Sequence, residues 1–383
     1  MRVLHVIPSV APRDGGPSQA VVAMCAALRA LEIDARIAAT DADGPHALPV
    51  TLNAPTEWKG VPALFFRRNA TVSFKYSRGL ASWLHRHVGD FDVVHVHAVL
   101  SHAPLAAAAA CRAHKAWRKR VLMLAAGHRA LDRAAAIHCT SAGEAGDLRA
   151  QGYDNTTVIP LGVDVPVDLE EYRVQPHGGT GRVADTSPYV LSLSRLDPKK
   201  NLETLIRAFA EARPHAGPPW RLVVAGDGDP QYAAALREAA RKADVEAHVD
   251  FVGWVDGAGK QALLGGASLF ALPSHHENFG IAVLEAAAYG VPSVVSRGVQ
   301  LGDSLESAGA AWLTGSDLTS FGAALTAAIS DADERARRAV LARTVAERFS
   351  WQRVATQLVA LYTAVRQGVG LEASRHAGVR AEA

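Results

Sequence analysis

The chain has 383 residues, of which 49% are hydrophobic and 20% are charged, and its formal net charge is +2. A chain of this length predicts two domains, and so small a net charge excludes nucleic-acid binding as its main function. Aromatic residues make up only 6% of the chain, whereas Ala and Val are abundant. This composition favours helices packed on parallel strands over an aromatic-rich β-sandwich.

Cysteine usage and apolar runs indicate the compartment. Cys25, Cys111 and Cys139 are too few and too widely spaced for a disulfide framework, and no C-x-x-C zinc motif occurs. We therefore predict a reducing, cytoplasmic location. The apolar N-terminus breaks at Pro8, which is typical of a buried first strand and not of a signal peptide. No run approaches the roughly 18 apolar residues that a membrane span needs.

The first half of the chain alternates strand and helix patterns. Apolar runs predict strands over residues 2–7, 35–39, 63–66, 92–97, 136–140 and 157–160. Helical patterns lie between them, over residues 18–31, 74–87, 103–114 and 142–151, with Ser18 as the N-cap of the first.

The second half repeats this alternation, with strands over residues 189–193, 221–225, 249–252, 269–272 and 293–296 and helices over 202–212, 230–242, from 279 onward and over 318–329. Two such series predict an α/β protein with two Rossmann-like, doubly wound parallel sheets. We therefore expect an N-terminal domain over 1–165 and a second domain over 188–348. A Pro- and Gly-rich linker covers 166–187, a helix 349–366 and a flexible tail 367–383.

The strongest motif is a pair of glutamates eight positions apart, Glu277 and Glu285, directly after the strand at 269–272. Glu277 would lie in the loop at the carboxyl end of that strand, and Glu285 about two turns into the next helix. Ligand sites of open α/β sheets form at this edge, and the free N–H groups at a helix start bind diphosphates. The alternative is a loop glutamate in solvent and a helix glutamate in a surface ion pair.

Two cations, Arg195 and Lys200, lie in the loop directly after the strand at 189–193. A leaving nucleoside diphosphate needs such side chains to neutralise its developing charge. Taken alone, this segment is equally well explained as a solvated basic loop, because exposed charges usually contribute little.

Weaker signals stand at the ends of other predicted strands. Gly226 belongs to a Gly-Asp-Gly turn, and Gly15 and Gly16 follow the first strand. Such glycines let the backbone approach a phosphate, but they also mark ordinary turns. His97 ends the strand at 92–97, on the same face as His95, where its side chain can meet a ligand. The alternative for His97 is a core histidine with a backbone partner.

Together these segments resemble glycosyltransferase family four, whose GT-B fold has two Rossmann-like domains that face each other across a cleft. The resemblance covers nearly the whole chain, and its most specific part is the E-x7-E pair with the upstream Arg195 and Lys200. Supporting elements are the Gly15-Gly16 pair, the strand that ends at His97, the segments 160–164 and 225–228, and Phe349-Ser350-Trp351 with the helix to Val365.

The resemblance implies roles for single residues. Arg195 and Lys200 would hold the donor diphosphate, Glu285 the ribose hydroxyls and Glu277 the transferred sugar, while His97 would lie near sugar and acceptor. The other residues implied in donor binding are Gly15 and Gly16 from the first domain, Gly226, Gly253 and Trp254 near the base, and the backbone of Asn278, Phe279, Gly280 and Ile281. Asn278 departs from the family, which often has Gly there, and the last helix would cross back onto the first domain.

The resemblance also implies the activity. It implies retaining, metal-independent transfer of a sugar from a nucleotide-sugar donor to a glycan or lipid-linked acceptor, in the synthesis of cell-surface polysaccharide or glycoconjugates. No metal and no cofactor are expected, and no nucleic-acid partner. Arg, Lys and a helix start can take over the charge stabilisation that a divalent cation would provide.

One interval breaks the strand–helix alternation. The helix at 103–114 runs into a second helical pattern at 117–133, which leaves no room for a strand between them. We therefore predict an N-terminal sheet that misses a strand and part of the acceptor wall, with donor binding kept and transfer weakened. The cations, Trp and aliphatic residues of 115–124 suit either a peripheral contact with the inner membrane surface or a helix that packs its apolar side on the sheet.

Two other functions stay open. The missing segment would suit a degraded relative that binds nucleotide without transferring sugar, and a nucleotide-sugar 2-epimerase shares the fold. A dinucleotide-binding dehydrogenase is disfavoured, because the loop over residues 8–16 lacks G-x-G-x-x-G.

Overall fold

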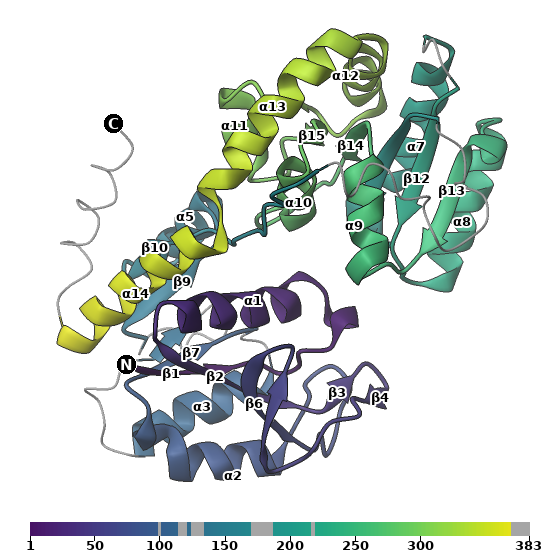
Figure 1. Cartoon of the computed structure of the whole chain (residues 1–383). Coiled ribbons are helices and arrows are strands. Elements are labelled where there is room, and N and C mark those ends of the chain that lie inside the picture. The colour runs from purple at the N-terminus through teal and green to yellow at the C-terminus, as the bar shows by residue number, and fades with distance from the viewer. Residues whose placement is uncertain (99–100, 114–120, 124–133, 170–186, 216–218, 369–383) are drawn as a thin grey trace. The chain divides into compact units, whose positions relative to one another are not determined.

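The computed structural model describes residues 1–98, 101–113, 121–123, 134–169, 187–215 and 219–368 (Figure 1). The chain divides into two compact units. Unit 1 holds Met1–Gly162 and the C-terminal segment from Trp351, and unit 2 is Val163–Ser350. Most of the expected linker, 170–186, and the expected tail from 369 lie outside the described residues.

Unit 1 is built on an eight-stranded sheet with the order β10-β9-β8-β7-β1-β2-β6-β5. Its neighbouring strands are parallel, except that β5 runs antiparallel to β6. The strands are β1 (Arg2–Val6), β2 (Asp34–Thr40), β5 (Pro55–Trp58), β6 (Val61–Phe66), β7 (Val93–Val96), β8 (Val121–Met123), β9 (Ala136–Cys139) and β10 (Thr156–Val158), and β3 (Ala42–Asp43) pairs with β4 (His46–Ala47).

Helices cover both faces of this sheet, because its strands alternate between two apolar cores. Val3 and Ile37 belong to the core beneath α1 and α14, and Leu4 and Val6 to the core beneath α2 and α3 (Figure 1). The α-helices are α1 (Gly16–Ala30), α2 (Arg78–His87), α3 (His102–Ala113), α5 (Ala142–Ala150) and α14 (Trp351–Gln367), and short 3-10 turns are η1 (Pro12–Asp14) and η2 (Val88–Asp90). The last helix thus belongs to unit 1.

Two local predictions for unit 1 are wrong. Ser18 is not the N-cap of α1, which begins after Gly15; the Ser18 hydroxyl instead donates to the carbonyl of Ser9 at 2.9 Å. The helix expected over 74–87 begins only at Arg78, where the Ser77 side chain accepts from the N–H of Leu80.

The predicted gap in the first sheet is also wrong. β8 (Val121–Met123) lies between β7 and β9 and pairs in parallel with both, so the sheet is continuous. The strand has only three residues, which is too short for a period-2 pattern to be recognised, and cations and alanines flank it in the sequence. The remainder of the proposed interfacial segment, 115–120 and 124, lies outside the part of the chain that the structure describes.

Unit 2 contains a six-stranded parallel sheet with the order β13-β12-β11-β14-β15-β16. Its strands are β11 (Tyr189–Leu193), β12 (Arg221–Ala225), β13 (Val249–Gly253), β14 (Leu269–Leu272), β15 (Ser293–Ser296) and β16 (Ala311–Thr314). Its helices are α7 (Leu202–Ala212), α8 (Pro230–Lys242), α9 (Gly257–Gly266), α10 (Ile281–Ala288), α11 (Gly302–Ser307), α12 (Leu318–Ser330) and α13 (Ala332–Arg348), with 3-10 turns η3 (Pro198–Lys200), η4 (Arg213–His215) and η5 (Glu246–His248).

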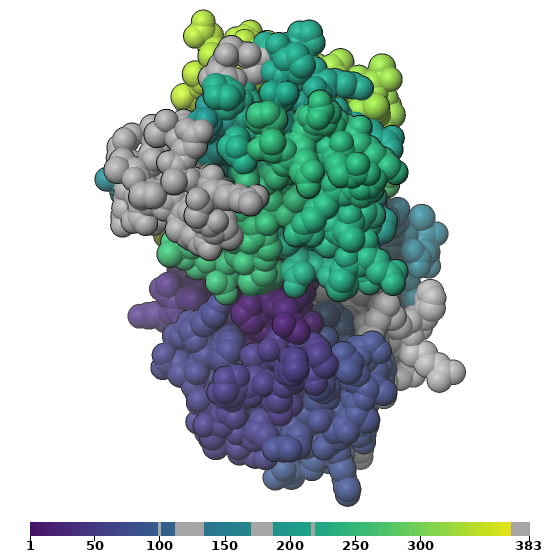
Figure 2. All heavy atoms as spheres, turned by 90° about the vertical axis from the view of Figure 1, so that its right-hand side faces the viewer, coloured from purple at the N-terminus to yellow at the C-terminus, as the bar shows by residue number. Residues whose placement is uncertain are grey.

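The strands of unit 2 are continuous apolar runs because helices cover both faces of a parallel sheet. Each residue of β14 and of β15 is buried. Large side chains such as Trp220, Phe209 and Phe321 fill the core between the sheet and helices α7 and α12. Figure 2 shows the coloured atoms on one face of each unit closely packed against one another.

The strand order places a switch point in each unit, where the chain changes the direction in which it builds the sheet. In unit 2 the switch point lies between β11 and β14, and in unit 1 between β1 and β7. Ligands of doubly wound sheets bind outside the carboxyl ends of the strands at this point. The two predicted Rossmann-like sheets are thus confirmed.

Candidate active site

The switch point of unit 2 brings together Lys200 and Glu277. β11 leads into η3, which Asp197 caps, and Lys200 is its last residue with 8% exposure. Glu277 lies in the loop that follows β14. The Lys200 ammonium donates to the Glu277 carboxylate, so the strand order turns residues far apart in sequence into one ion pair.

Hydrogen bonds fix these two loops to each other. Asn201 adopts a left-handed conformation with φ 57°, and its side-chain amide donates to the carbonyls of Pro273 at 3.3 Å and Ser316 at 2.7 Å. The carbonyl of Lys199 accepts from the N–H of His275 at 2.8 Å and from the hydroxyl of Ser274 at 3.0 Å. The ion pair therefore rests on a rigid backbone frame.

Helix α10 begins next to this ion pair. Its N-cap, Gly280, has φ 95°, and no side chain caps the helix. A Cβ at Gly280 would lie 2.6 Å from Cγ1 of Val299, so only glycine fits. Oδ1 of the exposed Asn278 accepts a hydrogen bond from Nε2 of His276 at 3.0 Å, while Phe279 is buried. The helix starts at Ile281, two residues later than predicted, and its first N–H groups have no side-chain acceptor.

Glu285 lies within α10 and forms an ion pair of its own. Its carboxylate accepts from Nζ of Lys260, on α9, at 2.8 Å. Both side chains are partly buried, with 21% and 20% exposure. Lys260 also acts at longer range on Asp164. Burial raises the pKa of the Asp164 carboxyl above its usual value, and the Lys260 ammonium offsets part of this rise.

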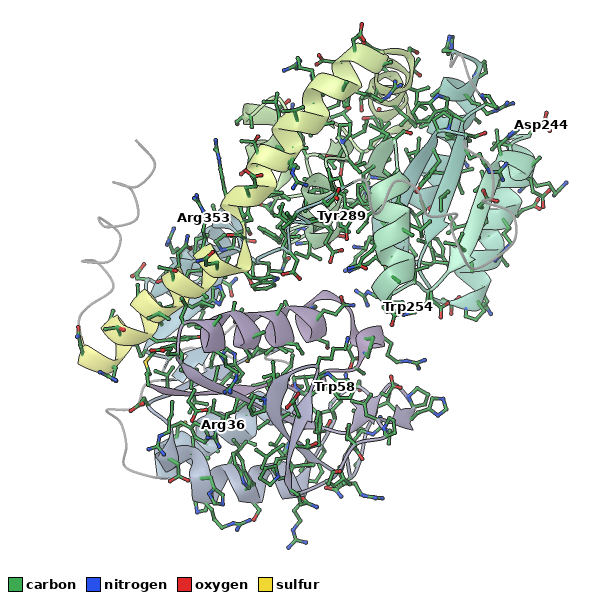
Figure 3. All side chains as sticks on the ribbon, in the orientation of Figure 1. Arg36, Trp58, Asp244, Trp254, Tyr289 and Arg353 are labelled. Atoms are coloured by element: carbon green, nitrogen blue, oxygen red, sulfur yellow. The ribbon has the colours of Figure 1, made fainter. Side chains whose placement is uncertain are left out.

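The loops after β11, β12 and β13 stack at the same edge of the sheet. A Cβ at Gly226, which has φ 146°, would lie 1.7 Å from the carbonyl oxygen of Ser194. The N–H of Gly226 donates to the carbonyl of Gly253 at 2.7 Å. Arg195 is exposed on the first of these loops, and Trp254, with 41% exposure, lies at the periphery of unit 2 between β13 and α9 (Figure 3).

The remaining predicted residues belong to unit 1 and follow the two strands of its switch point. Gly15 is the N-cap of α1 with φ 85°, and Gly16 is the first residue of that helix, which also lacks a side-chain cap. His97 directly follows β7 and is 5% exposed. These residues form a second group, which belongs to unit 1.

His97 is a buried histidine, but its partner is another side chain and not backbone. Its Nε2 lies 3.0 Å from Nδ1 of His5 on β1. Burial, followed by the charges of His5 and His138, lowers the pKa of His97 well below its usual range. The ring is therefore neutral at physiological pH and is not poised as a proton-transferring base.

Comparisons with known proteins identify the family and the fold. The family model "Glycosyltransferase Family 4" matches residues 14–166, and the model "Glycosyl transferases group 1" matches residues 180–344. The chain belongs to glycosyltransferase family 4. Among the residues that the structure describes, no helix is long and apolar enough to cross a membrane.

Curated relatives of the family 4 chain include two mannosyltransferases. One is 32% identical over 58% of this chain and 56% of its own length: the GDP-mannose-dependent alpha-(1-6)-phosphatidylinositol dimannoside mannosyltransferase of Mycobacterium tuberculosis. The other, the GDP-mannose:cellobiosyl-diphosphopolyprenol alpha-mannosyltransferase of Komagataeibacter xylinus, is 25% identical over 95% of this chain and 93% of its own. The chain thus spans about half the length of the first relative and nearly all of the second.

Solved structures support the fold of the family 4 chain. Anabaena HepE in complex with UDP and glucose superposes with a TM-score of 0.73 at 19% identity, over 95% of this chain and 100% of that one. Sucrose-phosphate synthase from Thermosynechococcus elongatus has a TM-score of 0.74 at 18% identity, over 96% and 99%. At this identity the likeness shows the fold alone, which is the GT-B fold predicted from the sequence.

Three residues of the candidate site escaped the sequence interpretation. His5 lies inside an apolar first strand, Ser274 beside the E-x7-E motif, and Lys260 in a Gly- and Ala-rich segment. The one signal available was Lys260, which is the sole charged residue of α9. The Ser274 hydroxyl lies 3.2 Å from Oε1 of Glu277, three residues away, whereas His5 meets His97 only through strand order.

Proposed function

We propose that this chain is a glycosyltransferase that moves a hexose from a nucleoside-diphosphate sugar to a glycan or lipid-linked acceptor. The observation that carries the proposal is the pair of ion pairs on either side of the uncapped start of α10, Lys200 with Glu277 and Lys260 with Glu285. Cations, carboxylates and free N–H groups at a switch point match the three parts of such a donor: pyrophosphate, sugar and ribose.

Charge stabilisation of the leaving diphosphate falls to Arg195, Lys200 and the start of α10 in this proposal. Arg195 is exposed, whereas Lys200 is buried against Glu277, so the two cations would approach the diphosphate from different depths of the site. Fixed cations and helix N-termini stabilise developing negative charge without reorganisation. We therefore propose a metal-independent reaction, with no cofactor.

The carboxylates would bind hydroxyl groups. Glu285 would accept from the ribose hydroxyls, and Glu277 from the hydroxyls of the transferred sugar, with the backbone of Asn278 and Ile281 close by. Each carboxylate already has a lysine partner that keeps it oriented. Retention of the anomeric configuration is part of the proposal and rests on family membership.

The relatives support a narrower choice of substrates. GDP-mannose is the donor in the names of three relatives, and all three names specify a lipid or lipid-linked acceptor. We therefore propose GDP-mannose as the first donor to test and a lipid-linked glycan of a cell-surface polysaccharide as the acceptor, with the reaction at the cytoplasmic side. A peripheral contact with the inner membrane surface belongs to the same proposal.

A thermal-shift titration tests the donor. GDP-mannose, UDP-glucose and ADP-glucose are compared in the presence of EDTA, because a ligand that binds the native state raises its melting temperature by mass action. Glu285→Gln should abolish the shift. Glu306→Gln, on the exposed surface of α11 in the same unit, is the matched control and should keep it. No shift with any nucleotide sugar would contradict the proposal.

A product assay separates transfer from the two alternatives. GDP-[14C]mannose is incubated with and without a lipid extract, and the products are resolved by chromatography. Label in a lipid fraction supports transfer. An epimeric nucleotide sugar formed without acceptor would indicate a 2-epimerase, and binding with no product of any kind would indicate a non-catalytic relative. The continuous first sheet removes the structural argument for that last alternative.

A further inference from the structure

The interior of unit 1 holds four histidines at the carboxyl ends of β1, β7 and β9. His5, His95 and His138 have 0% exposure and His97 has 5%. Burial lowers the pKa of His5 to about 3 and that of His138 to about 4, and the pKa values of His95 and His97 lie well below the usual range. Each ring is neutral, so one nitrogen carries a proton and the other is a bare acceptor.

His138 shows which nitrogen stays bare in this cluster. Its Nε2 lies 2.6 Å from the carbonyl oxygen of Ile159, and a carbonyl only accepts. The proton is therefore on Nε2. Nδ1 of His138 is buried without a partner, so the orphaned atom is a lone pair and not an N–H group. That is the expected choice, because orphaned buried N–H groups are rarer than under-satisfied acceptors.

The same rule, that a buried ring nitrogen without a partner is the unprotonated one, fixes the proton positions of His5 and His97. Nε2 of His5 is buried without a partner, while its Nδ1 lies 3.0 Å from Nε2 of His97. If the orphaned Nε2 is the bare nitrogen, then Nδ1 of His5 carries the proton and donates it. Nε2 of His97 is then the acceptor, and the proton of His97 is on Nδ1.

We propose that His5 is a positioning residue that holds His97 in the tautomer protonated at Nδ1, so that His97 offers a hydrogen-bond donor to a substrate oxygen at the end of β7. This inference rests on the proposed function, since it assumes that a sugar reaches this end of unit 1. His97 would then orient or polarise a hydroxyl or ring oxygen of the sugar, with no proton transfer.

A metal ion is the competing use of these rings. One nitrogen each of His5, His95 and His97 lies within 4.8 Å of the others. The rings are stacked, however: His95 and His97 have centroids 4.2 Å apart at 24°, and His5 and His97 5.2 Å apart at 19°. Imidazole lone pairs lie in the ring plane, so stacked rings do not aim them at one point. The group also contains no anionic ligand.

Nitrogen-15 NMR of the full chain labelled in histidine reads the tautomer directly. The His97 signals are assigned by their loss in His97→Gln. We expect a protonated Nδ1 and a bare Nε2 in the wild type, and loss of this fixed tautomer in His5→Leu. His5→Asn should restore it, because the Asn amide nitrogen takes the place of Nδ1. A protonated Nε2 in the wild type would overturn the inference, as would stoichiometric Zn²⁺ binding that His5→Leu abolishes.

Turnover separates positioning from packing. Release of GDP from GDP-mannose should fall about ten-fold in His5→Leu, the loss expected for one hydrogen bond, and recover in His5→Asn. We expect the opposite order for thermal stability: His5→Leu should be more stable than His5→Asn, because Leu fills the buried space and Asn does not. Turnover that follows stability would overturn the inference. No GDP release by the wild type would instead count against the proposed donor, while the NMR result would still decide the tautomer.

Discussion

Nζ of Lys260 lies 2.8 Å from Oε1 of Glu285, so a cation from α9 holds the helix glutamate of the E-x7-E pair. A ribose that binds Glu285 must share the carboxylate with this ammonium. Lys260 also raises the positive charge of a site that we propose for a dianionic pyrophosphate.

Replacing Lys260 tests whether this cation belongs to the donor site. We expect Lys260→Met to weaken GDP binding roughly three- to ten-fold, because Glu285 then repels the phosphates, and to flatten its salt dependence. Calorimetric titration at two ionic strengths measures both effects. Lys242→Met is the control, since Lys242 is 72% exposed on α8 of the same unit. If Lys260→Met and Lys242→Met bind GDP with equal affinity, Lys260 does not contribute to the donor site.

Lys200 and its neighbour Lys199 form a matched pair of variants. Lys200 is 8% exposed and paired with Glu277, whereas Lys199 is exposed and its carbonyl, not its ammonium, anchors the loops. We expect Lys200→Met to lower turnover about 10²- to 10³-fold and stability by about 1–3 kcal/mol, because Glu277 loses its partner. Lys199→Met should change neither.

A double variant separates the two effects of Lys200. In Lys200→Met with Glu277→Gln no unpaired charge remains, so urea denaturation should recover most of the lost stability. Turnover should stay low, because both groups that face the donor are gone. Recovery of turnover would contradict the roles assigned to this ion pair.

Gly226 tests the packing of the loops at the edge of the second sheet. Gly226→Ala would place a Cβ 1.7 Å from the carbonyl oxygen of Ser194, at φ 146°. We expect a loss of about 2 kcal/mol or more in stability and of donor binding, because the backbone of the Arg195 loop must move. Gly259→Ala is the control: its Cβ meets nothing within 4 Å, so the helix α9 should tolerate it or gain stability.

The buried histidines predict that unit 1 loses stability in acid. The pKa of His138 falls from 6.5 unfolded to about 4 folded, so between these values only the unfolded chain binds the proton. Stability from this group is complete above pH 6.5 and is lost as the pH falls toward 4. Between pH 7.5 and 5.5 we expect a loss of about 1.4 kcal/mol from His138. Its ring faces His5, His95 and His97, which shift the same way.

Urea denaturation of the wild type and of His138→Gln at pH 7.5 and 5.5 measures this loss. The Gln side chain can still donate to the carbonyl of Ile159 but does not titrate in this range. We expect the drop in stability between the two pH values to shrink by about 1.4 kcal/mol in the variant. An unchanged drop would show that His138 does not stay neutral in the folded chain.

The sequence by itself determined the fold class, the family and five strands of the second unit, but not β16 (Ala311–Thr314) at the edge of its sheet. Parallel strands covered on both faces are continuous apolar runs, so β11, β12 and β14 can be predicted without any tertiary information. Arg195, Lys200 and Glu277 could be chosen because each stands directly after such a strand. Local pattern failed at β8, whose three residues are too few for any periodicity.

Only the tertiary structure decided which of these side chains meet. The crossovers bring β1 beside β7 and β11 beside β14, and this places His5 against His97 and Lys200 against Glu277, 92 and 77 positions apart. Lys260 reaches Glu285 only because α9 packs on α10. Local spacing carries no record of such contacts, since they follow from strand order and helix packing and not from the residues beside them in the chain.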